Sequence, residues 1–201
     1  MQLIRSPGKN ILELLPGLMA MSILFGTTSM LAVTITFERS GRSFERLMLA
    51  PISLNLMLLA KIAGTIIFGM FNAFVPIVFA SFFIDLKGVN FGIILPAVFM
   101  IALSSALMGL MIAVSAKQVF EAQTFSNFFR FPMLFLCGLF IPISDLPVFL
   151  RPISYCLPLT YGADILKGAI TGVNIFSPVL SFFMLLFFSV ALFLISKHNI
   201  N

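Results

Sequence analysis

The sequence predicts an all-α, polytopic membrane protein, and two observations lead to this prediction. The first is composition: 60% of the 201 residues are hydrophobic and only 9% are charged, with a mean hydropathy of +1.14. Soluble domains have about 45–50% apolar and about 25% charged residues, so these charges are too few to keep a soluble surface wet. The second is the distribution of charge along the sequence: long, largely uncharged stretches separate the charged residues. We therefore expect lipid to surround most of the chain.

Five of these stretches are long enough to cross a membrane. A hydrocarbon core about 30 Å thick needs about 20 apolar residues in a helix, and lipid offers no partner for backbone N–H and C=O groups. The stretches do not alternate polar and apolar residues as barrel strands do. The whole chain, residues 1–201, would then be a single membrane domain. We expect spans at about 14–36, 58–84, 91–115, 124–143 and 174–196.

Residues required by several other functions are absent. His198 is the only histidine and lies in the C-terminal tail, so no Ser/His or Cys/His catalytic centre can form within the membrane. Cys137 and Cys156 lack metal-ligand spacing; we expect packing residues, with a disulfide across the outer loops as the alternative. The net charge of +5 comes without a basic run, which favours anionic lipid over nucleic acid as a partner. We expect no enzyme activity, no metal and no cofactor in this chain.

No acidic residue lies inside a predicted span. Ion-coupled carriers usually hold an ionisable group near the bilayer midplane, where the coupled ion binds. Because this chain has no such carboxylate, we expect the energy for any transport to come from outside the polypeptide. The seven acidic residues lie at or beyond span ends: Glu13, Glu38, Glu45, Asp85, Glu121, Asp145 and Asp164.

Arg130 is the one charge well inside a predicted span. One interpretation is structural: the side chain extends to the nearer membrane interface, or it pairs with Glu121 or another carboxylate. The alternative is a contact to an anionic substrate. The sequence leaves the role of Arg130 open.

The most polar part of the chain, residues 37–51, holds five of the nineteen charged residues. On a helix, its apolar residues share one stripe and its charged residues a neighbouring face, and Pro51 ends the helix. We expect a short surface helix over 37–50, which is either an interfacial anchor or a docking helix for a soluble partner. The stripe consists of Phe37, Gly41, Phe44 and Met48, and the charged face carries Glu38, Arg42 and Glu45.

Two motifs resemble those of ABC type-2 exporter permeases. The first is similar to the coupling-helix signature of that family and consists of Glu38-Arg39-x-Gly41, Glu45-Arg46-Leu47, Ala50-Pro51-Ile52-Ser53 and Lys61. The second resembles the outer segment of the family and consists of Phe131-Pro132, residues 137–142, Leu146-Pro147, Ile153, residues 157–160 and Asp164. The resemblance covers residues 16 to about 196 and is closest to the branch that exports drugs, polysaccharides and nodulation factors.

The resemblance implies a permease subunit of an ATP-driven exporter in the cell (cytoplasmic) membrane. Two such subunits, identical or homologous, would form the path, and each would dock one ABC ATPase subunit that holds ATP and Mg. The substrate would be amphipathic, drug-like, lipid-linked or a polysaccharide. An ion-coupled carrier or channel and a non-transporting membrane scaffold are the alternatives. The implied coupling-helix residues are Glu38, Arg39, Gly41, Arg42, Phe44, Glu45, Arg46, Leu47 and Pro51.

Prolines interrupt the mostly apolar stretch 141–166 every five or six residues, so no continuous helix can form there. Broken apolar helices that enter one leaflet without crossing it fit this pattern, and so does an outer loop with proline turns. The resemblance implies the former, a re-entrant helical hairpin over 144–166 that closes the outer side of the path. Its marker residues are Pro142, Pro147, Pro158 and Asp164.

The number of spans departs from the family pattern. Members usually carry six spans, with a surface helix before the first, whereas this sequence predicts five. If the coupling helix is cytoplasmic, an odd number of spans places Met1 outside the cell and Asn201 inside. The distribution of Lys and Arg between the two sides supports this orientation only weakly. We therefore expect a truncated or misassigned start, with about 40–70 further residues upstream that contain one more span of about 20 residues.

Phe44→Ala, or charge reversal at Glu45 and Arg46 together, should uncouple ATP hydrolysis from export while the protein stays in the membrane. Truncating a buried aromatic anchor typically costs about 2 kcal/mol or more of binding free energy, whereas a charge at the rim costs less. Export and ATP hydrolysis are measured on the same vesicles, and Phe44→Cys or Leu47→Cys should cross-link to the ATPase. Wild-type export by both variants, without any cross-link, contradicts the coupling assignment.

Overall fold

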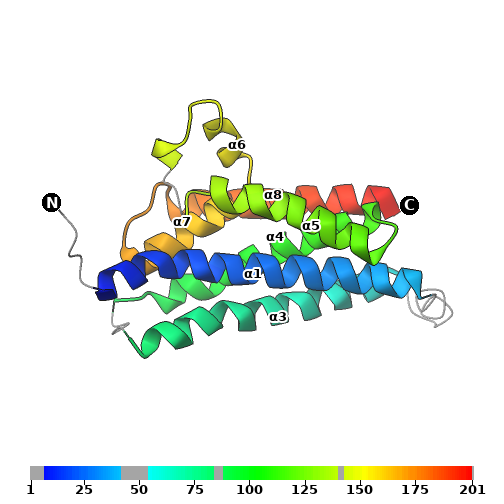
Figure 1. Cartoon of the computed structure of the whole chain (residues 1–201), viewed down its shortest axis with the longest axis horizontal. Coiled ribbons are helices and arrows are strands. Elements are labelled where there is room, and N and C mark those ends of the chain that lie inside the picture. The colour runs from blue at the N-terminus through cyan, green and yellow to red at the C-terminus, as the bar shows by residue number, and fades with distance from the viewer. Residues whose placement is uncertain (1–6, 42–53, 84–87, 140–142, 201) are drawn as a thin grey trace.

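The computed structural model describes residues 7–41, 54–83, 88–139 and 143–200. All regular elements in these residues are helices, as the sequence predicts (Figure 1). The short helices η1 (Ile143–Asp145), α6 (Arg151–Tyr155) and α7 (Pro158–Thr171) lie between the last two long ones. The long helices are α1 (Pro7–Ser40), α3 (Leu54–Ser81), α4 (Phe91–Ser115), α5 (Val119–Leu136) and α8 (Pro178–Ile200).

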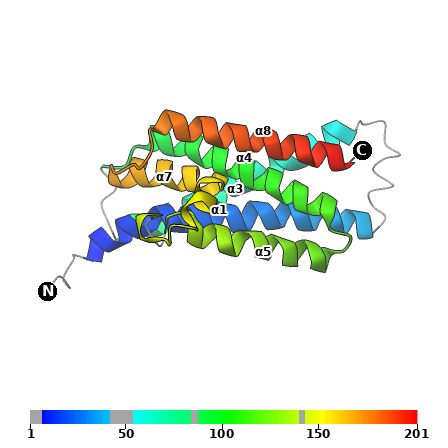
Figure 2. The ribbon, with the colours of Figure 1, turned by 90° about the horizontal axis from the view of Figure 1, so that it is seen from above.

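The long helices lie side by side, with α5 and α8 on opposite flanks (Figure 2). Helix α4 is central, because it contacts α1, α3, α5, α7 and α8. In the most apolar 18-residue stretch of each helix, 72% of the residues are buried in α4, against 33% in α3 and 22% in α8. A helix that is apolar on all sides is either a core helix or a membrane span, and α4 is both. The outer helices direct large apolar side chains outward, where lipid can cover them.

Four helices of the described residues are long and apolar enough to cross a membrane: Leu12–Ser40, Leu56–Ser81, Phe91–Ser115 and Pro178–Lys197. They correspond to four of the five predicted spans. Helix α5, the remaining one, is not among them, and the number of five spans stays a prediction.

Three predicted boundaries need correction. The predicted span 124–143 is wrong at its end, because α5 stops at Leu136 and Gly138 adopts a φ of 81°, a left-handed conformation that glycine tolerates and that ends helices. The last span begins at Pro178 rather than at residue 174. Residues 37–40 continue α1 and do not begin a separate surface helix, while residues 42–50 of that predicted helix lie outside the described residues.

Small residues allow the helices around α1 to approach closely. A Cβ added to Gly109 on α4 would lie 2.8 Å from the backbone oxygen of Thr28 on α1. At the same place, the hydroxyl of Thr28 donates to the carbonyl oxygen of Ser105 at 3.3 Å. On α3, a Cβ added to Gly69 would lie 2.2 Å from Cγ2 of Thr27. Close backbone approach at small residues is how helices associate in lipid, where the hydrophobic effect does not drive them together.

Residues 143–171 form separate short helices and not a continuous one. Pro152 and Pro158 lie in the first turns of α6 and α7, where a missing backbone N–H costs no hydrogen bond. Helix α7 is buried against α4, α1 and α8, whereas α6 projects from the bundle (Figure 1). The hydroxyl groups of Thr160 and Tyr161 donate to the carbonyl oxygens of Ser154 and Tyr155, at 2.6 and 2.9 Å, and join α7 to α6. Whether these short helices enter the membrane as the expected re-entrant hairpin over 144–166 stays a prediction.

Both cysteines are free thiols, Cys137 buried and Cys156 exposed. The disulfide considered from the sequence is therefore not formed, and Cys137 is a packing residue in the core.

Gly109→Ala should lower the stability of the protein, while Gly64→Ala should not. The added methyl at Gly109 meets the rigid backbone of Thr28, and overpacking of this kind costs about 1–3 kcal/mol. Gly64, in α3, has nothing within 4 Å of an added Cβ, so that variant gains only helix propensity. Thermal unfolding midpoints of both variants in detergent test the prediction, and equal midpoints would contradict the close α1–α4 contact.

Candidate functional site

Several helices begin or stop at one end of the bundle, which we call the charged end; the C-terminal end of α8 lies there too (Figure 1). Here α1 stops at Ser40, α3 begins at Leu54, α4 stops at Ser115 and α5 begins at Val119 (Figure 1). The predicted site residues Glu38, Arg39 and Gly41 lie at this end. The other predicted coupling residues lie outside the described residues: Arg42, Phe44, Glu45, Arg46, Leu47 and Pro51.

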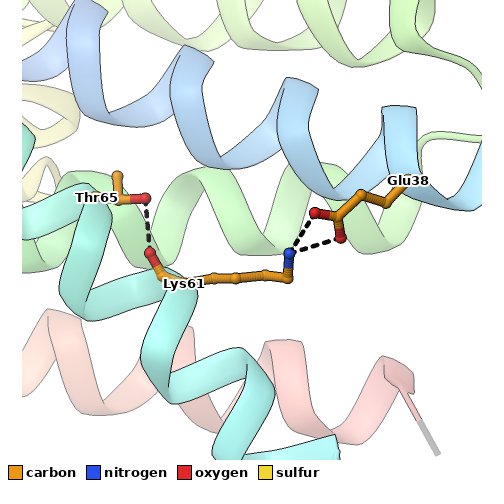
Figure 3. A network of polar contacts seen from close by, with 3 residues as sticks. All are labelled: Glu38, Lys61 and Thr65. Atoms are coloured by element: carbon orange, nitrogen blue, oxygen red, sulfur yellow. Dashed lines mark hydrogen bonds and ion pairs between the residues drawn. The ribbon is translucent and has the colours of Figure 1, made fainter. Parts of the chain in front are cut away.

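Glu38 on α1 and Lys61 on α3 form an ion pair across the two helices (Figure 3). The Nζ atom of Lys61 lies 2.5 Å from Oε1 and 2.6 Å from Oε2 of Glu38. The side chains are only 20% and 17% exposed, so solvent screens this pair less than a surface pair. The hydroxyl of Thr65 donates to the carbonyl oxygen of Lys61 at 2.8 Å, one turn further along α3. The pair fixes the separation of the two helices on either side of segment 41–53.

Arg39 connects α1 to α4. Its Nη1 donates to the carbonyl oxygen of Ala113 at 3.1 Å, in the last turn of α4. The last carbonyl groups of a helix lack partners within the helix and carry a partial negative charge, which suits a cation. Together, Glu38 and Arg39 tie the end of α1 to α3 and to α4.

These contacts change the interpretation of the first motif. The sequence suggested that Glu38 and Arg39 point toward a soluble partner from a surface helix. In the structure both belong to α1, and both side chains bind groups of this chain. Gly41 forms the turn that follows, with its N–H donating to the carbonyl oxygen of Phe37 at 2.9 Å.

Lys61 is the residue whose role the sequence analysis missed, although it belongs to the quoted motif. The signal was present: a lysine near the start of an apolar span requires a counter-charge. Glu38 is the acidic residue at the end of the preceding span, and antiparallel neighbouring helices bring the two positions together.

The predicted residues at the opposite end have structural contacts. Asp164 on α7 is buried, and its carboxylate accepts from the backbone N–H groups of Ile175 at 2.7 Å and Phe176 at 3.0 Å, which orders the turn into α8. Pro147 is exposed in the turn after η1, and Pro158 begins α7. Pro142 lies outside the described residues.

Arg130 does not pair with Glu121. The Glu121 carboxylate accepts from the backbone N–H of Lys117 at 2.9 Å, at the start of α5. Arg130 lies more than two turns further along that helix and donates to Ser29 of α1 and Asn127 of α5.

Comparison with known proteins identifies the family. The family model of ABC-2 type transporters matches residues 3–171. The chain belongs to the ABC-2 type transporter family. It is 24% identical over 182 residues to the inner membrane transport permease YadH of Escherichia coli strain K12, covering 90% of this chain and 71% of that protein. YadH of Shigella flexneri matches with the same identity and coverage.

Membership of this family, together with the apolar helices, makes the chain a multi-pass membrane permease of the cell membrane. The predicted resemblance is thereby confirmed. The described residues of the first motif of that resemblance lie at the charged end: Glu38, Arg39, Gly41 and Lys61.

A double-mutant cycle should show that Glu38 and Lys61 stabilise each other. Lys61→Met leaves the partly buried Glu38 carboxylate without a counter-charge and should cost about 1–2 kcal/mol, less than a fully buried pair because both groups touch solvent. Glu38→Gln in the Lys61→Met background should recover part of that loss. Lys117→Met, an exposed lysine at the same end, is the matched control. Additive effects in chemical denaturation would refute the coupling.

Proposed function

We propose that the chain is the permease subunit of an ATP-driven exporter. Two such subunits, identical or homologous, surround a path, and each docks an ABC ATPase that holds ATP and Mg²⁺. ATP hydrolysis then occurs in the partner, and this chain has no enzymatic role. Family membership supports the proposal, and so does the placement of charge in the described helices.

The placement of carboxylates argues for an external source of energy. Among the described residues, Glu13 and Glu38 lie near the two ends of the span Leu12–Ser40, and Glu121 caps the start of α5. Asp145 is in η1, and Asp164 orders the turn before α8. None is near the middle of a candidate span, where an ion-coupled carrier holds its coupling group. This distribution disfavours an ion-coupled carrier.

The observation that carries the proposal is the Glu38–Lys61 ion pair. In sequence, segment 41–53 lies between α1 and α3, and the pair joins these two helices to each other. A displacement of the segment by an ATPase is then passed to α1 and α3 together, and through Arg39 to α4. Packed helices shift between discrete arrangements and do not deform continuously, so a small push at this end can switch the permease.

The proposed substrate class rests on the resemblance of the two sequence motifs to the branch that exports drugs, polysaccharides and nodulation factors, and on the apolar character of the helices. We propose an amphipathic, drug-like, lipid-linked or polysaccharide substrate. The outward side of α5 is aromatic, with Phe120, Phe128 and Phe135 each more than half exposed. Aromatic faces suit amphipathic molecules, since they contact apolar chains and ring systems equally well.

Transport in proteoliposomes should distinguish this proposal from its alternatives. The complex is purified from its own membranes and reconstituted with rhodamine 6G as a drug-like probe and a fluorescent phosphatidylglycerol as a lipid probe. At least one probe should move only with ATP, and ionophores that collapse ion gradients should have no effect. Movement that requires an imposed ion gradient instead indicates a carrier, and movement without either source indicates a channel. No movement and no associated ATPase would indicate a scaffold.

A further inference from the structure

Arg130 is buried between α1 and α5 with neutral partners only. The residue is 1% exposed. Its Nη2 donates to the hydroxyl of Ser29 at 2.6 Å, and its Nη1 lies 3.5 Å from Oδ1 of Asn127. The guanidinium carbon is 5.0 Å from the centre of the Phe25 ring, a cation–π contact. Its Nε has no hydrogen-bond partner.

The guanidinium lies well away from both ends of the candidate span of α1. Its partner Ser29 is 17 residues from Leu12 and 11 from Ser40 in the candidate span of α1. At about 1.5 Å per residue these separations are about 25 and 16 Å, longer than an arginine side chain. With its guanidinium enclosed between α1 and α5, Arg130 does not extend toward either end of that span.

No carboxylate of the described residues neutralises this cation. Glu38 pairs with Lys61, Glu121 binds the Lys117 N–H and Asp164 binds two backbone N–H groups. A buried charge without a counter-charge is costly, and arginines inside membranes usually face a pathway or a partner. Arginine has five N–H donors, of which two have partners here. Its unused donors can bind one further group.

A second polar group beside Arg130 also lacks a partner. Ser126 is one turn earlier on the same face of α5, is fully buried, and its hydroxyl makes no hydrogen bond. Buried hydroxyl groups without partners are uncommon, because desolvation without a hydrogen bond costs about 1–3 kcal/mol. Two unsatisfied groups on one helix face point to a ligand that supplies acceptors.

We propose that Arg130, with Ser126 and Ser29, binds the negatively charged headgroup of an amphiphile in transit between α1 and α5. A phosphate or carboxylate presents the acceptors that a guanidinium fork fits. Phe25 and Phe131, edge to face at 5.9 Å, flank the apolar part of that molecule. Ser29 lies near the middle of the candidate span of α1, whereas resident lipids hold their headgroups at the membrane interface, so the proposed anion is one that is crossing. The site is closed in this arrangement, and access requires α1 and α5 to separate.

The inference rests on the proposed function, because it names the substrate class that an exporter of this kind would take. Its test needs neither ATP nor the ATPase, so it can fail or succeed independently of ATP-driven export.

A single-tryptophan variant provides the binding assay. The chain has no tryptophan, and Phe131→Trp places one beside the Phe25 ring. The full chain in phosphatidylcholine nanodiscs is titrated with octyl phosphate and, as the neutral amphiphile of equal chain length, octyl glucoside. Octyl phosphate should shift the tryptophan emission saturably, with at least about tenfold higher affinity than octyl glucoside. Arg130→Gln should remove that preference, Arg130→Lys should keep part of it, and Lys117→Gln, the control for net charge, should change nothing.

Stability measurements separate binding from a structural role. Since the buried cation lacks a counter-charge, Arg130→Gln should unfold at the same temperature as the parent or higher, and octyl phosphate should stabilise the parent only. Nanodiscs that contain phosphatidylglycerol identify the source of the headgroup. If phosphatidylglycerol competes with octyl phosphate, the site binds membrane lipid that crosses. If it does not compete, the site binds other amphiphiles. Equal affinity for both octyl compounds, an unchanged preference in Arg130→Gln, or destabilisation of Arg130→Gln without loss of preference overturns the proposal.

Discussion

Lipid cannot satisfy a backbone amide or a charge, and the arrangement of this chain follows from that constraint. Every long element is a helix, and the central helix α4 is the most completely enclosed of the four candidate spans. Charged groups lie near helix ends, where Glu38 and Lys61 pair and Arg39 binds the end of α4. Among the residues that the structure describes, Arg130 is the exception, a cation in the middle of the bundle with only neutral partners. The functional proposals therefore concern two sites: the charged end, with Glu38 and Lys61, and the surroundings of Arg130.

Helix α1 connects those two places. Glu38 and Arg39 lie near one of its ends, and Phe25 and Ser29 lie near the middle of its candidate span. A helix transmits displacement along its axis with little loss, because its backbone hydrogen bonds hold the turns together. In the proposed mechanism, a displacement of the end of α1 would therefore reach the contact between α1 and α5 through the helix itself. Gly109 packs closely against Thr28, so in the proposed mechanism α4 would be the support for a displacement of α1.

The sequence predicted the helical fold because apolar length alone decides which segments enter a membrane. The sequence analysis misplaced helix boundaries that depend on contacts between side chains of different helices. Charge at Glu38 and Arg39 suggested an interface, but Lys61 and the Ala113 carbonyl satisfy these side chains and α1 continues through them. Lys61, the partner of Glu38, and Ser29, one of the two partners of Arg130, come from other helices, 23 and 101 residues away in sequence. Spacing along one helix cannot reveal such contacts, so the sequence left Arg130 open between the membrane interface, a carboxylate and an anionic substrate, and missed the role of Lys61.

The central claim is that an ATPase moves α1 relative to α5 through the charged end. The most direct test is a spin-label distance between Met30 of α1 and Phe128 of α5, both exposed, after Met30→Cys and Phe128→Cys replacement in a chain whose Cys137 and Cys156 are changed to Ser. In the complex with its ATPase, ATP should shift the distance distribution, and Lys61→Met should reduce that shift. A distribution that stays unchanged by ATP while export proceeds would contradict the account.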